Sequence, residues 1–407
     1  MRILLSDGSG LTARQVATLL GREGHVVEAL NPAGFALARF TRWVTRVHEC
    51  PPFGDDPLAW LDTALDVLRT GGFDLFLPTQ EQVTVLSGAA ARVHALGVRM
   101  PVPAFSSLEQ VQDKLSAYRT LNRVGLRQPP SRIVTTPDEL MAVDLIPAFV
   151  KSPIGTAGAG VTRVGDRGAL RDLVPKLTPA FTEAGGVLVQ QPVRGPLVMV
   201  QSVFDRGGLI AWHANLRVRE GSGGGASHKR SVDLPYIAPD LARLGGELGW
   251  HGALSLDAIL DGGTVTYIDV NPRLVEPANA RLSGVDLVGA LIDASSPRAA
   301  APRERGRPDV ASHQLLLAVV KAAESGRTAV LRELWRAAVR TGPYRGSTEE
   351  LTPVRADPRA FLPLAFVTAR LLVSPRPARS FADETVRRYA LGQSGWAALK
   401  DRFGARR

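Results

Sequence analysis

Residues 150–161 of this 407-residue chain read VKSPIGTAGAGV, an apolar strand that ends at Lys151 and continues into a loop of glycines and small residues. Glycine backbone can approach the oxygens of a phosphate chain closely, and a lysine at the strand end adds a point charge. The loop does not fit the Walker pattern, because no Gly-Lys-Ser/Thr sequence ends it. This stretch alone therefore leaves two interpretations open, a polyphosphate-binding loop and a glycine-rich hairpin.

A second group of polar residues lies in a predicted hairpin farther along the chain. Asp257 is in the apolar strand 254–260, and a Gly-Gly turn leads into a strand that carries Asp269 and Asn271. Because side chains alternate along a strand, Asp269 and Asn271 share a face, and hairpin pairing can bring Asp257 to it. Two carboxylates and an amide oxygen suit Mg²⁺, which shares its coordination shell with substrate phosphates. The hairpin therefore predicts a magnesium site.

Residues 1–105 alternate short apolar strands with helical patterns. The expected strands are 2–6, 25–30, 74–77 and 98–102. Repeated strand-helix units predict a Rossmann-like parallel sheet, which binds ligands at the carboxyl ends of its strands. The turn 7–10 (DGSG) and Glu81 would lie there. A tight turn also explains the glycines, and the first turn of a helix also favours an acid, so the functional and structural interpretations both stay open.

These motifs, in this order, resemble the ATP-grasp superfamily over roughly residues 1–295, in particular its carboxylate-amine ligases and carbamoyl-phosphate-synthetase-like members. The resemblance implies that loop 153–161 covers the β- and γ-phosphates of ATP and that the hinge 187–193 holds adenine. It assigns nucleotide contacts to Lys114, Lys151, Gly155, Thr156, Ala157, Gly158, Gln190, Gln191 and Val193. It assigns the metal to Asp257, Asp269 and Asn271.

The same resemblance implies a multidomain α/β and α+β fold in four parts. Residues 1–105 would form the N-terminal α/β domain, and residues 106–185 the first ATP-grasp lobe with its glycine-rich loop. Residues 186–295 would form the second lobe with the metal site. Residues 296–407 would be a basic, mainly helical C-terminal region.

The mechanism implied by the resemblance converts a carboxylate into an acyl phosphate with ATP and Mg²⁺ or Mn²⁺. An amine then attacks, and an amide, ADP and phosphate are the products. Arg273 would face the transferred phosphoryl group, Arg217 or Arg219 would hold the carboxylate or the oxyanion, and Lys229 would reach the site from loop 221–230. An exposed position at a strand end explains Arg217 and Arg219 equally well.

Two other functions share these motifs. A carboxylase or a carbamoyl-type phosphotransferase would bind ATP in the same way and differ in its acceptor. A non-catalytic nucleotide-binding scaffold is suggested by the hinge, where Gln190 replaces the usual glutamate and no acid for the ribose follows. Both metal carboxylates are Asp where Glu is commoner, which shortens their reach by one methylene.

Composition and charge narrow the class of protein. The 45% apolar and 22% charged content is typical of a globular enzyme, and one cysteine, Cys50, excludes a disulfide framework. No apolar run approaches the ~20 residues that span a bilayer, so we expect a cytoplasmic protein without membrane contacts that acts on small molecules. Residues 297–407 carry 21 Lys and Arg against 10 Asp and Glu, but without interleaved aromatics, so nucleic acid is not an expected partner. A homodimer is left open.

Helical periodicity marks the C-terminal quarter. Helices are expected at 314–324, 330–340 and 382–403, and the apolar segment 361–373 is expected to be a core helix. Two apolar stripes should be covered by the rest of the protein, one formed by Leu315, Leu316, Val319, Val320 and Ala323 and the other by Leu331, Leu334, Trp335 and Ala338.

Overall fold

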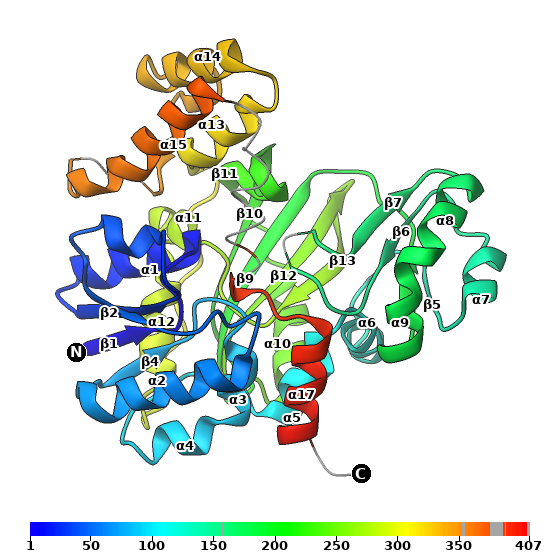
Figure 1. Ribbon diagram of the computed structural model, residues 1–407, viewed down its shortest axis with the longest axis horizontal. Coiled ribbons are helices and arrows are strands. Elements are labelled where there is room, and N and C mark those ends of the chain that lie inside the picture. Colours follow the sequence, from blue (N-terminus) through cyan, green and yellow to red (C-terminus); the bar gives the residue numbers. More distant parts are fainter. Residues whose placement is uncertain (157, 352–354, 375–385, 387, 405–407) are drawn as a thin grey trace.

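The computed structural model describes residues 1–407 except 157, 352–354, 375–385, 387 and 405–407 (Figure 1). Its N-terminal part is a four-stranded parallel sheet in the order β3-β2-β1-β4. The elements are β1 (Arg2–Leu5), α1 (Leu11–Arg22), β2 (Val26–Asn31), β3 (Val44–Glu49), α2 (Pro57–Gly71), β4 (Leu75–Leu77), α3 (Val83–Gly88) and α4 (Ala90–His94). The chain leaves β1 for β2 on one side and reaches β4 on the other, so β1 and β4 flank the topological switch point.

Both faces of this sheet are covered, as the alternating sequence predicts. The side chain of Asp56 caps α2 by accepting from the backbone N–H groups of Leu58 and Ala59, and Trp60 of that helix stacks on Phe76 of β4. The strand expected at 98–102 is wrong, because the chain makes only an isolated bridge there. The edge strand β3 was not expected, since its polar residues obscure the alternation.

The first lobe is an antiparallel sheet in the order β5-β8-β6-β7, at the right of Figure 1. Its elements are β5 (Ser131–Val134), α7 (Pro137–Ala142), β6 (Ala148–Lys151), β7 (Val161–Val164), α8 (Arg167–Leu173), α9 (Thr178–Glu183) and β8 (Val187–Gln190). Helices α5 (Phe105–Gln112) and α6 (Lys114–Arg123) precede it. The side chain of Asp113 caps α6, which fixes Lys114 as the first helical residue.

The second lobe is built on a seven-stranded sheet in the order β13-β12-β9-β10-β11-β14-β15. Its elements up to the C-terminal region are β9 (Leu197–Asp205), β10 (Gly208–Glu220), β11 (Ala226–Ser231), α10 (Ile237–Leu248), β12 (Gly252–Asp261), β13 (Thr264–Asn271), α11 (Ala278–Ser283) and α12 (Leu287–Ala294). Helix α12 packs in one apolar cluster with α1 and β1, which joins this lobe to the N-terminal part.

The C-terminal region extends this sheet, which the sequence did not reveal. Its described elements are β14 (Ala311–His313), α13 (Leu315–Ala323), α14 (Arg327–Ala338), β15 (Thr348–Glu349), α15 (Phe361–Val373) and α17 (Gln393–Phe403). Strand β14 pairs antiparallel with β11, and β15 pairs parallel with β14. Helix α17 begins later than the expected helix 382–403, of which residues 382–385 and 387 lie outside the described part of the chain.

The two expected apolar stripes have different outcomes. In α13, Val319, Val320 and Ala323 are buried against α15. In α14, however, Leu331 is 53% exposed and Trp335 is 67% exposed, so the prediction that this stripe is covered is wrong. The physical reason is that α14 packs through the face that carries Val330, which leaves the face with Leu331 and Trp335 in solvent. Helices α13, α14 and α15 form a separate group at the top of Figure 1. Among the described residues, no helix has the length and apolar character that crossing a membrane requires.

Candidate functional site

A narrow pocket lies where the first lobe, the second lobe and the N-terminal part meet. It is lined by Glu81, Val111, Gln112, Lys114, Ile154, Gly155, Thr156, Asp269, Val270, Asn271, Pro272 and Leu391. Five of the sequence-predicted site residues are therefore brought together here, from the start of α6, the glycine-rich loop and the end of β13.

The two predicted nucleotide lysines are buried and bind backbone oxygens. The ammonium of Lys114 donates to the carbonyl of Gly155 over 2.9 Å, and that of Lys151 donates to the carbonyl of Ile268 over 2.7 Å. Burial lowers the pKa of Lys151, and the charge of Asp269 opposes that shift. Within the described residues neither lysine forms an ion pair, so both cations remain available to an anion.

The glycine-rich loop has the backbone that its sequence requires. Gly158 and Gly160 have φ values of +81° and +75°, which glycine adopts at little cost. A Cβ on Gly155 would lie 2.0 Å from the carbonyl oxygen of Ala159, so the loop closes on itself tightly. Thr156 of the loop faces Glu81 at 3.5 Å, and Ala157 lies outside the described residues.

The predicted hinge lies at the end of β8, next to β5 and β6. Gln190 is buried and pairs in register with Ser131 and Phe149. The backbone N–H of Gln191 already donates to the carbonyl of Pro130 over 2.9 Å. Neither glutamine nor Val193 lines the pocket described above, so the adenine contacts implied by the resemblance stay a prediction.

The three predicted metal ligands meet on the hairpin β12–β13. Asp257 lies opposite Asp269, and Asn271 lies opposite Ser255. Burial, together with the neighbouring charge of Asp269, raises the pKa of Asp257 to about 6. Two carboxylates held this close favour a cation between them. Within the part of the chain described, no group of three or more His, Cys, Asp or Glu can hold a metal, so phosphate oxygens would have to complete a shell here.

Arg273 faces the N-terminal part of the molecule. Its Nε donates to Oε1 of Glu81 over 3.2 Å, and both side chains are buried. Glu81 also lies 3.5 Å from Nε2 of Gln112. The contact links the end of β13 to the end of β4, so Glu81 lies at the candidate site. The sequence had left open whether Glu81 has a functional or a structural role.

Asp7 is a buried carboxylate at the end of β1, on the other side of the switch point from Glu81. It accepts from the backbone N–H groups of Ser9 and Gly10 and from the Ser9 hydroxyl. Burial raises its pKa to about 6, although these hydrogen bonds and the charge of Arg273 oppose the shift. Sequence reasoning named the turn but not this side chain, although an acid directly after the first strand was the available signal.

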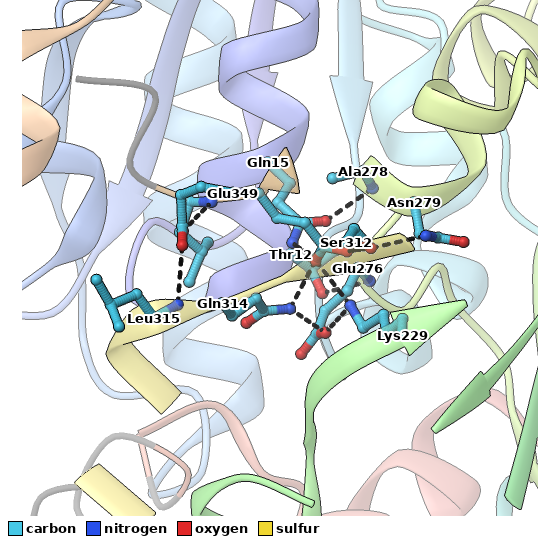
Figure 2. A network of polar contacts seen from close by, with 12 residues as sticks. Thr12, Gln15, Lys229, Glu276, Ala278, Asn279, Ser312, Gln314, Leu315 and Glu349 are labelled. Carbon is cyan, nitrogen blue, oxygen red and sulfur yellow. Dashed lines mark hydrogen bonds and ion pairs between the residues drawn. The ribbon is translucent and has the colours of Figure 1, made fainter. Parts of the chain in front are cut away.

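Lys229 lies in a buried network that joins three parts of the chain (Figure 2). Its ammonium is 2.5 Å from Oε2 of Glu276 and 2.8 Å from Oε2 of Glu350. Gln314 donates to both carboxylates, and Gln15 of α1 donates to Glu350. Burial alone would lower the pKa of Lys229, but the two carboxylates outweigh burial and raise it. Glu276 and Glu350 were missed, because only tertiary packing brings them to Lys229.

The two arginines of β10 have separate environments. Arg219 forms a bidentate ion pair with Glu333 of α14. This contact directs the Arg219 side chain toward the C-terminal helices and away from the pocket. Arg217 donates to the carbonyl of Gly224 over 2.7 Å, and its charge lowers the pKa of Asp257. Arg217 also lies 3.5 Å from a carboxylate oxygen of Glu220, so it contacts its own strand and the loop that follows rather than α14.

Known proteins resemble this chain weakly in sequence and more clearly in fold. No protein-family model matches the chain. The large chain of carbamoyl phosphate synthase from Thermus thermophilus is 22% identical over 189 residues, which are 44% of this chain and 18% of the relative. The chain thus corresponds to a small part of that relative's length.

Solved structures resemble the chain over most of its length. The biotin carboxylase domain of 2-oxoglutarate carboxylase from Hydrogenobacter thermophilus has a TM-score of 0.62 at 17% identity, covering 76% of this chain and 73% of that one. N5-carboxyaminoimidazole ribonucleotide synthetase from Thermus thermophilus has a TM-score of 0.56 at 20% identity, covering 76% and 81%. L-amino acid ligase from Bacillus licheniformis has a TM-score of 0.54 at 18% identity, covering 73% and 75%. The shared architecture is the ATP-grasp fold, which confirms the predicted fold class.

Proposed function

We propose that this chain is an ATP-dependent ligase that activates a carboxylate as an acyl phosphate and couples it to an amine. The observation that carries the proposal is the pocket lined by Lys114, the glycine-rich loop and Asp269, with Asp257 opposite Asp269 on the neighbouring strand. Lys114, Lys151 and the glycine-rich loop would hold the phosphates of ATP. Asp257, Asp269 and Asn271 would hold Mg²⁺, which neutralises phosphate charge when it is bound.

The residues around Arg273 suit transfer of the terminal phosphoryl group to a carboxylate. A guanidinium binds two oxygens of a carboxylate or a phosphoryl group at once, and its charge is retained at any accessible pH. Glu81 fixes the direction of Arg273 through the 3.2 Å contact. Burial lowers the local dielectric, which strengthens the attraction between the guanidinium of Arg273 and the developing negative charge.

The switch point supports an amine as the acceptor. Asp7 and Glu81 place two carboxylates at the ends of β1 and β4, and the buried side-chain oxygen of Gln80 has no partner within the described residues. Asp7 already accepts from its own turn and Glu81 from Arg273, so the amide oxygen of Gln80 is the acceptor at this corner that a ligand donor could satisfy. An ammonium group supplies three donors and a positive charge, and an Asp with a raised pKa can take up a proton as the amine becomes a nucleophile.

A carboxylase or carbamoyl-type reaction is the second candidate. It is favoured by the similarity to carbamoyl phosphate synthase and to a biotin carboxylase domain whose structure contains bicarbonate. Bicarbonate would take the place of the organic carboxylate and meet the same arginine.

A screen of ADP release distinguishes these functions. Wild-type protein with Mg-ATP is tested against amino acids, dipeptides, small carboxylates and bicarbonate, singly and in pairs, and products are identified by mass spectrometry. A ligase requires a carboxylate and an amine together, whereas a carboxylase or carbamoyl-type enzyme requires bicarbonate. Tight ATP binding without substrate-dependent ADP release would show a non-catalytic scaffold instead.

A further inference from the structure

The chain that leaves β13 runs from Arg273 to Ala278, the first residue of α11, and we call it the Arg273 segment. Its backbone is fixed to α1 at two points. The N–H of Glu276 donates to the hydroxyl of Thr12 over 3.2 Å, and the N–H of Ala278 donates to the side-chain carbonyl of Gln15 over 2.9 Å. The far end of the segment is therefore held by the N-terminal part of the molecule.

Glu276, inside this segment, has an unfavourable backbone conformation. Its φ of +54° lies in the left-handed region, which residues with a Cβ seldom adopt. Such a conformation persists only where the surrounding contacts hold it, and it is commonest at functional sites. Because only two residues separate Glu276 from Arg273, a change of φ at Glu276 would redirect the chain that presents the Arg273 guanidinium.

A cluster of four buried side chains holds Glu276 from the side opposite its backbone contacts. The ammonium of Lys229 lies 2.5 Å from Oε2 of Glu276 and 2.8 Å from Oε2 of Glu350. Gln314 donates to the same two oxygens. Figure 2 shows Lys229 and Gln314 pointing toward Glu276. The Arg273 segment is thus joined to β11 through Lys229 and to the C-terminal region through Gln314.

Lys229 is the only cation in this cluster of four, which also contains two carboxylates. Without its ammonium, Glu276 and Glu350 would face each other as unpaired charges in a buried place, which is strongly disfavoured. The Lys229 side chain is 1% exposed and does not line the pocket of Lys114 and Asp269. Its position therefore suits holding Glu276 rather than contacting a substrate.

We propose that Lys229 is a positioning residue, which holds Glu276 in its left-handed conformation and thereby directs Arg273 at the candidate site. This inference rests on the function proposed above for Arg273. It differs from the role that the resemblance implies, in which Lys229 itself reaches the site. The C-terminal region takes part in the same function, because Glu350 completes the ion-pair cluster around Lys229.

The first test is structural and needs no substrate. Crystal structures of the full-length chain are compared for wild type, Lys229→Met and the control Arg14→Met. Arg14 also forms a buried ion pair with the C-terminal region, at 3.2 Å from Asp357, but its side chain donates only to Leu37, Phe40 and Asp357 among the described residues. The control therefore removes an equally buried cation without touching the Arg273 segment.

In Lys229→Met we expect φ of Glu276 to become negative and the Arg273 Nε to move beyond hydrogen-bonding distance of Glu81. Arg14→Met should keep both features. The double variant Lys229→Met/Glu350→Gln removes one of the two unpaired carboxylates, so it serves where the single variant is insoluble, and it should show the same displacement. A left-handed Glu276 with an intact Arg273–Glu81 contact in either Lys229 variant would overturn the inference.

The second test uses the ADP-release assay. In Lys229→Met, kcat should fall at least about tenfold, because a misplacement of 1 Å can cost about 100-fold. The KM for ATP should not change, and Arg14→Met should keep the kcat of wild type. In an Arg273→Lys background, Lys229→Met should lower kcat less than about twofold, because the arginine through which Lys229 acts is absent. An undiminished loss in that background would mean that Lys229 acts by another route.

The two tests separate this inference from the proposed ligase function. If no pair of substrates supports ADP release but Glu276 and Arg273 are displaced in Lys229→Met, the ligase function fails and the positioning role stands. If wild type turns over and Lys229→Met keeps both the arrangement of Glu276 and its kcat, the ligase function stands and the positioning role fails.

Discussion

At the scale of single residues, Asp269 bears most directly on the proposed metal site. Asp269→Asn removes one of the two charges that face each other across β12 and β13 while keeping the side-chain shape. Loss of an outer-shell partner of a metal costs up to about 100-fold in activity. Because Asp269 is a proposed direct ligand, we expect turnover to fall by more than that. The melting temperature of the ligand-free protein should not fall. Near-normal ADP release at saturating Mg²⁺ would contradict the assignment.

Lys151 tests the nucleotide site. Lys151→Ala should weaken ATP binding at least about tenfold, because a charge-assisted hydrogen bond to phosphate contributes roughly 1.5 to 3 kcal/mol. The dissociation constant of ATP can be measured calorimetrically. Lys176→Ala, at an exposed position of the same lobe, is the control and should bind ATP as wild type does.

Asp257 makes stability depend on pH. Its pKa is raised from 3.8 to about 6 in the folded protein, so the folded state binds the proton more tightly than the unfolded chain does. The ligand-free protein should therefore lose stability as the pH rises from about 4 to about 6. Asp257→Asn should remove this loss, with a gain of up to about 3 kcal/mol at pH 7 and none at pH 4.

Denaturant unfolding of wild type and Asp257→Asn at both pH values, without divalent metal, measures this difference. Saturating Mg-ATP should reverse the order of stability at pH 7, since only wild type has both of the carboxylates that we propose hold the metal. Identical pH profiles for the two proteins would show that Asp257 ionises as an ordinary surface acid.

At the scale of elements, the glycine-rich loop depends on one close approach. Gly155→Ala places a Cβ 2.0 Å from the carbonyl of Ala159, so the loop backbone must move. We expect a raised KM for ATP and a lower kcat, with little change in melting temperature because the loop is outside the core. Gly165→Ala, where a Cβ meets nothing within 4 Å, is the control and should leave both constants unchanged.

At the scale of the whole molecule, the C-terminal region should be indispensable. Deleting residues 310–407 removes β14, β15 and α17, exposes the edge of β11, and leaves Lys229 with only one of its two buried carboxylates. Removing one partner of a buried ion pair often costs about 3 to 5 kcal/mol. We expect an insoluble or much less stable protein. Soluble truncated protein with wild-type melting temperature and ADP release would show that the region is an appendage.

Whether a feature could be predicted from the sequence depends on how far apart along the chain its interacting residues lie. The strand-helix alternation, the glycine loop and the hairpin of Asp257 and Asp269 are local patterns, since periods of 2 and 3.6 residues and short turns appear directly in the sequence. Those patterns were enough to predict the parallel sheet and the pairing of Asp257 with Asp269, whereas the two lobes were implied by the resemblance to the ATP-grasp superfamily. They failed for β14 and β15, because three-residue and two-residue strands show too little alternation.

The sequence by itself therefore determined the fold class and the order of the glycine-rich loop and the hairpin that pairs Asp257 with Asp269. The tertiary structure alone decided which distant side chains meet, such as Glu81 with Arg273 and Lys229 with Glu350. The physical reason is that these contacts depend on how separately folded layers pack against one another. Side chains that share no strand or helix carry no common period, so only the packed molecule shows that Arg219 faces Glu333 while Arg273 faces the site.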